Sequence, residues 1–154
     1  MPTSGLAATT LPIALALLAG IATAYQPGIN AKFAHFSGSP IWGGVSNFAV
    51  GLFAVLLVAA LTRSPLPDPS RLAQGPWWMW AGGFCGAFFV TIAIILVPSM
   101  GTANYLTVMI AGQLIASLVI DHFGHLNLAV REVTPARLLG IALVGIGVVL
   151  VRKF

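Results

Sequence analysis

Five long runs of apolar residues, almost free of charged side chains, dominate this sequence. A membrane-spanning helix needs about 20 mostly apolar residues, and each run is long enough or nearly so. The chain is only 6% charged and 58% apolar, whereas soluble domains are about 25% charged. Such a chain cannot cover a soluble core with a polar shell. We therefore predict one domain, an all-α integral membrane protein with five transmembrane helices at roughly 11–34, 41–61, 78–97, 103–121 and 135–151.

The connecting segments contain most of the turn-forming residues. The run PLPDPS at 65–70 cannot continue a helix and predicts a loop in water. The segment at 98–101 is so short that we expect the third and fourth helices to form an antiparallel hairpin. Thr134 and Pro135 form the N-cap and first-turn pair that predicts the start of the fifth helix.

The basic residues give the chain little preference for one orientation in the membrane. With five helices, the two termini lie on opposite sides, and basic residues normally collect on the cytoplasmic side. One side would carry Arg63, Arg71, Arg131 and Arg137, and the other would carry Arg152, Lys153 and Lys32. A chain with so small a difference can insert both ways. Two opposed copies would then form an antiparallel homodimer that reproduces the inverted repeat of many transporters.

Several classes of protein are disfavoured by what the sequence lacks. The net charge of +4 comes from scattered residues, with no basic stripe for nucleic acid. Cys85 is the single cysteine, so no intrachain disulfide can form. Asp121, His122 and His125 are too few for a metal site. No nucleophile–base pair or phosphate-binding loop is present, so we expect no enzyme activity, metal or cofactor.

Polar residues inside spanning helices are costly and are therefore candidates for function. Gln26 and Asn30 lie four residues apart on one face of the first helix, beside Pro27 and Gly28. Because Pro27 removes a backbone hydrogen bond, we expect a locally opened helix that lines a substrate cavity. The alternative is a simple kink whose amides hold two helices together.

A second polar stripe lies on the fourth helix. Gln113, Ser117 and Asp121 follow one another at intervals of four residues, which keeps them within about 80° of one another around the helix. Asp121 is the only carboxylate near a spanning segment, so it is the candidate for proton coupling. The alternative is that Asp121 lies in the headgroup region and faces an arginine or histidine.

Small residues predict where helices approach closely. In membranes, glycines allow backbones of neighbouring helices to touch. The third and fifth helices present such surfaces, for helix packing or dimerisation, at Gly82, Gly83, Gly86, Gly140, Gly145 and Gly147.

Two functions fit these residues. The first is a secondary transporter of a small molecule that works by alternating access as a dimer. Its substrate site would lie near the middle of the bilayer and use Gln26, Asn30, Tyr105, Gln113 and Ser117. The second is a non-transporting membrane subunit or an ion channel, in which the same residues only hold helices together.

Four segments carry a family resemblance that runs nearly end to end. They are QPGINAKFAHFSGSP at 26–40, GGFCGAFFVT at 82–91, AGQLIASLVIDHFG at 111–124 and GIALVGIGVVLVRK at 140–153. With them, the chain resembles the short YdcZ-like family of the drug/metabolite transporter superfamily. The resemblance implies five helices equivalent to one half of a ten-helix transporter. It also implies assembly as a homodimer or with a sister protein, in a bacterial inner membrane.

The chain departs from related small multidrug resistance transporters in one respect. Those proteins carry a buried glutamate in the first helix, whereas this first helix has Gln26 and Asn30 and no acid. The resemblance therefore does not imply drug/proton antiport. Neutral amides are better suited to an uncharged or zwitterionic substrate.

Overall fold

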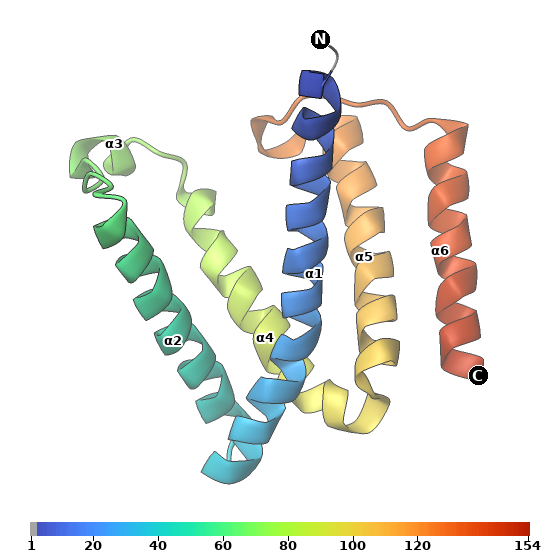
Figure 1. The fold of residues 1–154 in the computed structure, drawn as a ribbon, viewed down its shortest axis with the longest axis horizontal. Helices are drawn as coiled ribbons and strands as arrows, with labels where there is room; N and C mark the ends of the chain where they lie inside the picture. Colours follow the sequence, from blue (N-terminus) through green and yellow to red (C-terminus); the bar gives the residue numbers. More distant parts are fainter. Residues whose placement is uncertain (1–2) are drawn as a thin grey trace. The chain divides into compact units, whose positions relative to one another are not determined.

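The computed structural model describes the backbone of residues 3–154 and the side chains of residues 10–154. Its regular elements are all helices (Figure 1): α1 (Thr3–Ser37), α2 (Pro40–Leu61), α3 (Pro69–Ala73), the 3₁₀ helix η1 (Trp77–Trp80), α4 (Ala81–Met100), α5 (Thr102–Phe123), the 3₁₀ helix η2 (His125–Asn127) and α6 (Pro135–Lys153). Five stretches are long and apolar enough to cross a membrane: Thr10–Ser37, Pro40–Leu61, Trp77–Met100, Thr102–Phe123 and Pro135–Lys153. The prediction of an all-α protein with five transmembrane helices is confirmed.

The chain forms two compact units, Met1–Ser99 and Met100–Phe154. In the first unit, α1 and α2 run in opposite directions and are joined by a tight turn (Figure 1). Gly38 makes this turn possible because its φ is +73°, a conformation that other residues rarely adopt. The Ser39 hydroxyl then accepts a hydrogen bond from the Ile41 backbone N–H and caps α2.

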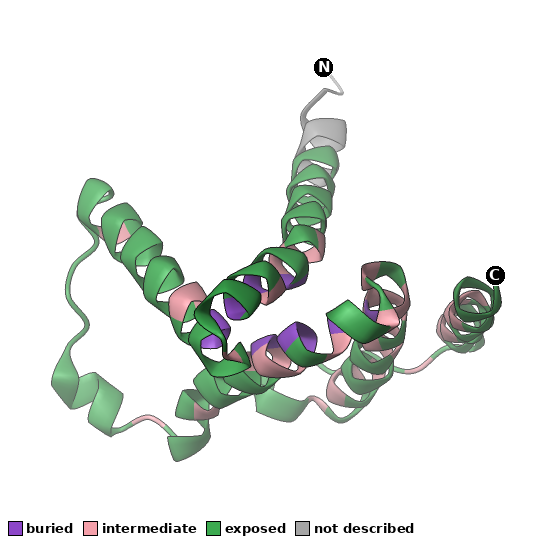
Figure 2. Cartoon of the chain, turned by 90° about the horizontal axis from the view of Figure 1, so that it is seen from below, coloured by how far each residue is buried: buried purple, intermediate pink, exposed green. Residues whose placement is uncertain are grey.

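The small core of the first unit lies where α4 contacts α1. Ala34 of α1 is buried against Val90 and Ile94 of α4, and Phe89 packs at its edge. Figure 2 shows how few residues are buried and how much of each helix is exposed. In α1 and α2, only 6% of the most apolar stretch is buried within the chain. Lipid or another protein must cover the rest, since so much apolar surface is unfavourable in water.

The second unit consists of α5 and α6 with η2 between them. Helix α5 ends at Gly124, which has a left-handed φ of +60°. The chain then folds back, and the backbone N–H of Arg131 donates to the Asp121 carbonyl at 2.8 Å. The Thr134 hydroxyl accepts from the Arg137 backbone N–H at 3.3 Å, with Pro135 next in the chain. The predicted start of the fifth transmembrane helix is confirmed.

The first and third transmembrane helices differ from their predicted forms. Helix α1 runs unbroken through Pro27, so the prediction of an opened helix is wrong. One missing backbone hydrogen bond does not break a helix whose proline is buried against its neighbours, and Pro27 is less than 2% exposed. Helix α4 likewise contains Pro98 and ends at Met100. The predicted connector at 98–101 is therefore too long, since only Gly101 separates α4 from α5. The predicted hairpin of these helices joins the two units and stays a prediction.

The proline-rich loop after α2 also contains one helical turn. Asp68 caps α3 by accepting hydrogen bonds from the Ser70 hydroxyl at 2.7 Å and the Ser70 backbone N–H at 2.9 Å. These hydrogen bonds hold the pKa of Asp68 below its usual value. The side chains around the turn are exposed, as expected for a loop in water.

Candidate functional site

Three amide side chains meet between α1 and α2. Gln26 and Asn30 lie one turn apart on α1, and both face Asn47 of α2. The Gln26 Nε2 donates to Asn47 Oδ1 at 2.8 Å, and the Asn30 Nδ2 donates to the same oxygen at 3.1 Å. We call Gln26, Asn30 and Asn47 the amide cluster. The prediction that the α1 amides share one face is confirmed.

The amide cluster lines a groove of about 580 Å³, here called the amide groove. Ser46 adds a hydroxyl, and no charged residue is among the described residues that line the groove. Each amide keeps one polar atom without a partner in the described chain: Gln26 Oε1, Asn30 Oδ1 and Asn47 Nδ2. The groove therefore offers hydrogen-bond acceptors and donors but no charge.

Gly43 explains why α1 and α2 approach closely enough to form the amide cluster. A Cβ atom at this position would lie 2.9 Å from the Asn30 carbonyl oxygen and 3.1 Å from the Ala34 Cβ. Both distances are shorter than ordinary contacts, so only glycine fits without displacing α1. The backbone contact lies at Asn30 itself, so it also fixes the position of that amide.

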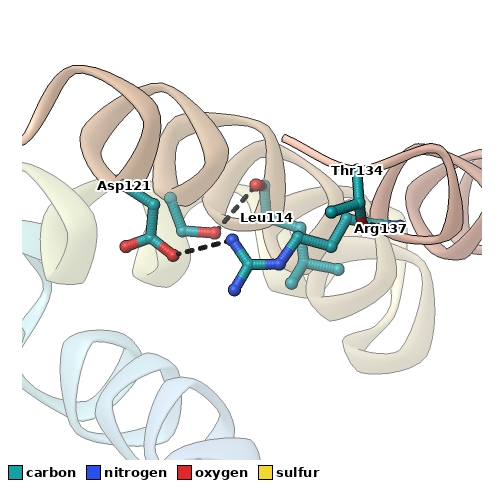
Figure 3. A network of polar contacts seen from close by, with 5 residues as sticks. Leu114, Asp121, Thr134 and Arg137 are labelled. Atoms are coloured by element: carbon teal, nitrogen blue, oxygen red, sulfur yellow. Dashed lines mark hydrogen bonds and ion pairs between the residues drawn. The ribbon is translucent and has the colours of Figure 1, made fainter. Parts of the chain in front are cut away.

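In the second unit, an ion pair joins α5 to α6 (Figure 3). The Arg137 Nη1 lies 3.4 Å from Asp121 Oδ2, and the two side chains are 37% and 35% exposed. Arg137 lies in the first turn of α6, which the Thr134 cap holds in place. Asp121, Ser117 and Arg137 line a cavity of about 280 Å³. Asp121 thus faces an arginine, as the alternative for this residue proposed.

The other candidate residues of α5, Tyr105, Gln113 and Ser117, differ in their burial and hydrogen bonding. The Ser117 hydroxyl donates to the Leu114 carbonyl of its own helix at 2.8 Å (Figure 3). Gln113 is exposed, does not line the Asp121 cavity, and makes no hydrogen bond to another described side chain. Tyr105 is 7% exposed and lies on the first turn of α5. Their roles in a substrate site stay predictions.

Most of the predicted glycine surfaces make no close contact inside the described chain. A Cβ atom would meet nothing within 4 Å at Gly82, Gly83, Gly140, Gly145 and Gly147. At Gly86 it would meet only the Phe48 ring at 3.8 Å, an ordinary contact. These positions leave room for another helix, and their part in dimerisation stays a prediction.

Asn47 and Gly43 were missed by the sequence analysis. Both lie in the second apolar run. Asn47 forms its only strongly polar pair with Ser46, and Gly43 forms a glycine pair with Gly44. The rules applied to the other helices would have selected them. Sequence periodicity could not have shown that Asn47 meets Gln26 and Asn30, because that contact depends on how α1 and α2 are aligned.

Comparison with known proteins points to one family. The family described as "Putative inner membrane exporter, YdcZ" matches residues 11–150, which include all five membrane-spanning stretches except the ends of the first and last. The "Inner membrane protein YdcZ" of Escherichia coli (strain K12) is 25% identical over 114 residues, which cover 74% of this chain and 76% of that protein. No solved structure matches the chain. The chain therefore belongs to the YdcZ family of bacterial inner membrane transport proteins, and it crosses that membrane several times.

Proposed function

We propose that this protein is one protomer of a secondary transporter that moves a small, uncharged or zwitterionic molecule by alternating access. The amide cluster in the membrane-spanning part of α1 and α2 carries this proposal. Polar side chains are expensive inside a bilayer, and three of them converge on one groove. Among the described residues that line this groove there is no acid, histidine or lysine to activate the Ser46 hydroxyl, which favours binding and release over an enzyme reaction.

The chemistry of the amide groove suggests the substrate class. A substrate hydroxyl or amine would donate to Gln26 Oε1 or Asn30 Oδ1, and a substrate oxygen would accept from Asn47 Nδ2. Because the described residues that line the groove carry no charge, a substrate with a net charge would lose its hydration without an ionic partner. Tyr105, Gln113 and Ser117 of the second unit are further proposed substrate contacts.

The proposed working unit is an antiparallel homodimer. No residue in the most apolar stretch of α6 is buried within the chain, and its glycines have no close neighbour. A second copy in the opposite orientation would supply the other half of an inverted repeat. Alternating access would then result from the two protomers rocking about a shared site.

Asp121 is the proposed site of proton coupling. Protonation would remove its charge and so break the ion pair with Arg137 at 3.4 Å. That pair holds α5 to α6 near one membrane surface, so its loss would free the two helices to move. Proton uptake could in this way be linked to a change in the conformation of the protomer.

A second candidate function is favoured by the amide cluster itself. Asn47 Oδ1 accepts from both α1 amides, which is what a purely structural contact between helices would require. In that case the protein would be a non-transporting membrane subunit or an ion channel. The two functions differ in whether a small molecule binds the amide groove.

Ligand-dependent stabilisation can distinguish them. The purified protein in detergent is heated in the presence of members of a library of neutral and zwitterionic metabolites, and the melting temperature is recorded. A ligand present at 100 times its Kd adds about 2.7 kcal/mol of stability. We expect a hit whose effect is lost in Asn30→Leu and retained in Gly20→Ala, because Gly20 lies in the same helix, does not line the groove and has nothing within 4 Å of an added Cβ atom. A library without hits, or hits unaffected by Asn30→Leu, would favour the structural function.

A further inference from the structure

A second groove in the first unit combines a cationic edge with an apolar wall. It has a volume of about 780 Å³ and shares no lining residue with the amide groove. Lys32 and His35 of α1 lie on one side, and Ile94, Ile95 and Val97 of α4 form the apolar wall. No acidic residue is among the described residues that line it. We call this the cationic groove.

The position of the cationic groove matches the headgroup region of a bilayer. It lies at the end of the first unit where the α1–α2 turn and the C-terminal end of α4 meet (Figure 1). The spanning part of α1 has 28 residues, or about 42 Å at 1.5 Å per residue, against about 30 Å of hydrocarbon. Lys32 precedes the end of this helix by about 7.5 Å, near the boundary between hydrocarbon and headgroups.

Lys32 has no acidic partner in the described chain. Its nearest described partner is the Phe36 ring, whose centroid lies 5.3 Å from Nζ. The same lysine borders a second apolar groove of about 570 Å³, lined by Tyr25, Phe33 and Phe36. An unpaired ammonium with apolar surface on both sides complements a molecule with one anionic group and two apolar chains.

We propose that the cationic groove binds an anionic phospholipid. Its phosphate contacts the Lys32 ammonium and accepts a hydrogen bond from a ring N–H of His35. One acyl chain lies along Ile95 and Pro98, which are exposed in the groove, and the other lies along Phe33 and Phe36 on the aromatic side of Lys32. The lipid would fill the groove beside the contact of α1 with α4 and would stabilise the folded first unit.

Lipid titration in detergent tests this proposal. Phosphatidylglycerol, phosphatidylcholine and glycerol 3-phosphate are each titrated into the protein, and the melting temperature gives an apparent affinity. We expect phosphatidylglycerol to stabilise the protein most. Equal stabilisation by phosphatidylcholine would overturn the role of charge. Equal stabilisation by glycerol 3-phosphate would show that the groove binds a soluble anion, and would overturn the proposal that it binds a lipid.

Matched variants locate the effect. The double variant Lys32→Gln/His35→Gln should weaken phosphatidylglycerol binding at least about fivefold, since each lysine at an anionic surface contributes about that factor. Lys153→Gln is the control, because Lys153 also lies over a ring, that of Phe154 at 5.5 Å, but does not line the groove. An equal loss in both variants would overturn the site.

A second measurement keeps the test valid if the double variant Lys32→Gln/His35→Gln folds poorly. Native mass spectrometry counts the lipids that each protein retains. The variant Lys32→Arg/His35→Gln keeps a positive charge at position 32 and lacks the His35 ring. Retention of phosphatidylglycerol by Lys32→Arg/His35→Gln but not by Lys32→Gln/His35→Gln supports the proposal. Retention by neither or by both overturns the contact between Lys32 and the phosphate.

Discussion

At the scale of single residues, Asn47 has the largest share of the polar contacts between α1 and α2. Its Oδ1 accepts from Gln26 at 2.8 Å and from Asn30 at 3.1 Å. An interhelical hydrogen bond in a membrane contributes about 0.6 kcal/mol on average. A ligand contact behaves differently, because removing one partner leaves a group of the site unpaired at a cost of about 1–3 kcal/mol.

We expect Asn47→Leu to lower the free energy of unfolding by about 1 kcal/mol, since two amides lose their acceptor. The measurement is thermal unfolding in detergent. Ser46→Ala is the matched control, because Ser46 lines the same groove without bonding to the cluster. The triple variant Gln26→Met/Asn30→Leu/Asn47→Leu should regain stability, as no amide remains unpaired, but should lose uptake. Normal uptake in the triple variant would mean that these amides only join helices.

Asp121 can serve as a proton carrier or only as the partner of Arg137. Asp121→Asn keeps the shape of the side chain and removes the proton site, whereas Arg137→Gln breaks the same ion pair but keeps the carboxyl group. Both side chains are more than a third exposed, so the pair itself contributes about 1 kcal/mol or less. The two substitutions should therefore have similar small effects on stability.

Both substitutions should reduce coupled transport. In proteoliposomes, Asp121→Asn should abolish accumulation driven by a proton gradient and leave exchange of substrate intact. Arg137→Gln removes the ion pair that protonation would break, so it should also reduce this accumulation. If Arg137→Gln keeps full accumulation, loss of the ion pair is not the coupling step, and if Asp121→Asn keeps it, Asp121 is not the proton carrier.

At the scale of helices, hydropathy predicted the elements well and their contacts poorly. Length and apolar content alone determine whether a helix can span a bilayer, so all five spans were found. Pro27 and Pro98 were both treated as breaks, and both lie inside helices. Neighbouring helices can compensate for one lost backbone hydrogen bond, and this compensation depends on packing that a single sequence does not display.

The close contact of α1 and α2 gives a test with an internal control. Gly43→Ala would place a Cβ atom 2.9 Å from the Asn30 carbonyl and 3.2 Å from Ile94 Cδ1. The backbone of α1 must then move, at a cost of about 1–3 kcal/mol. Gly51→Ala lies in the same helix with nothing within 4 Å, so it should leave stability unchanged or raise it. Equal melting temperatures for the two variants would contradict the packing seen at Gly43.

At the scale of the whole molecule, the odd number of spans sets the topology. We expect five crossings to place the N-terminus and C-terminus on opposite sides of the membrane. In this expected topology, the loop containing Asp68 and the segment between α5 and α6 would share one side with the N-terminus. The turn at Gly38 would share the other side with the C-terminus, and we therefore expect Lys32 and His35 on the side that carries Arg152 and Lys153.

The near balance of basic residues between the two sides leads to the last prediction, which concerns the proposed antiparallel dimer. Reporters fused to the C-terminus should show activity on both sides of the membrane, since neither orientation is strongly favoured. Three lysines added after Phe154 should turn nearly all copies to one orientation, and uptake should fall because opposed pairs can no longer form. Three added glutamines are the uncharged control and should leave both orientations and uptake unchanged.

Co-expression completes the test. A copy with added lysines in the loop at 65–70 should insert the opposite way and restore uptake when paired with the C-terminal lysine variant. Neither variant alone should transport. Rescue distinguishes loss of the opposed partner from damage to the protomer, because damaged protomers would stay inactive in the mixture. Full uptake by a population with a single orientation would instead require a parallel dimer or a protomer that transports by itself.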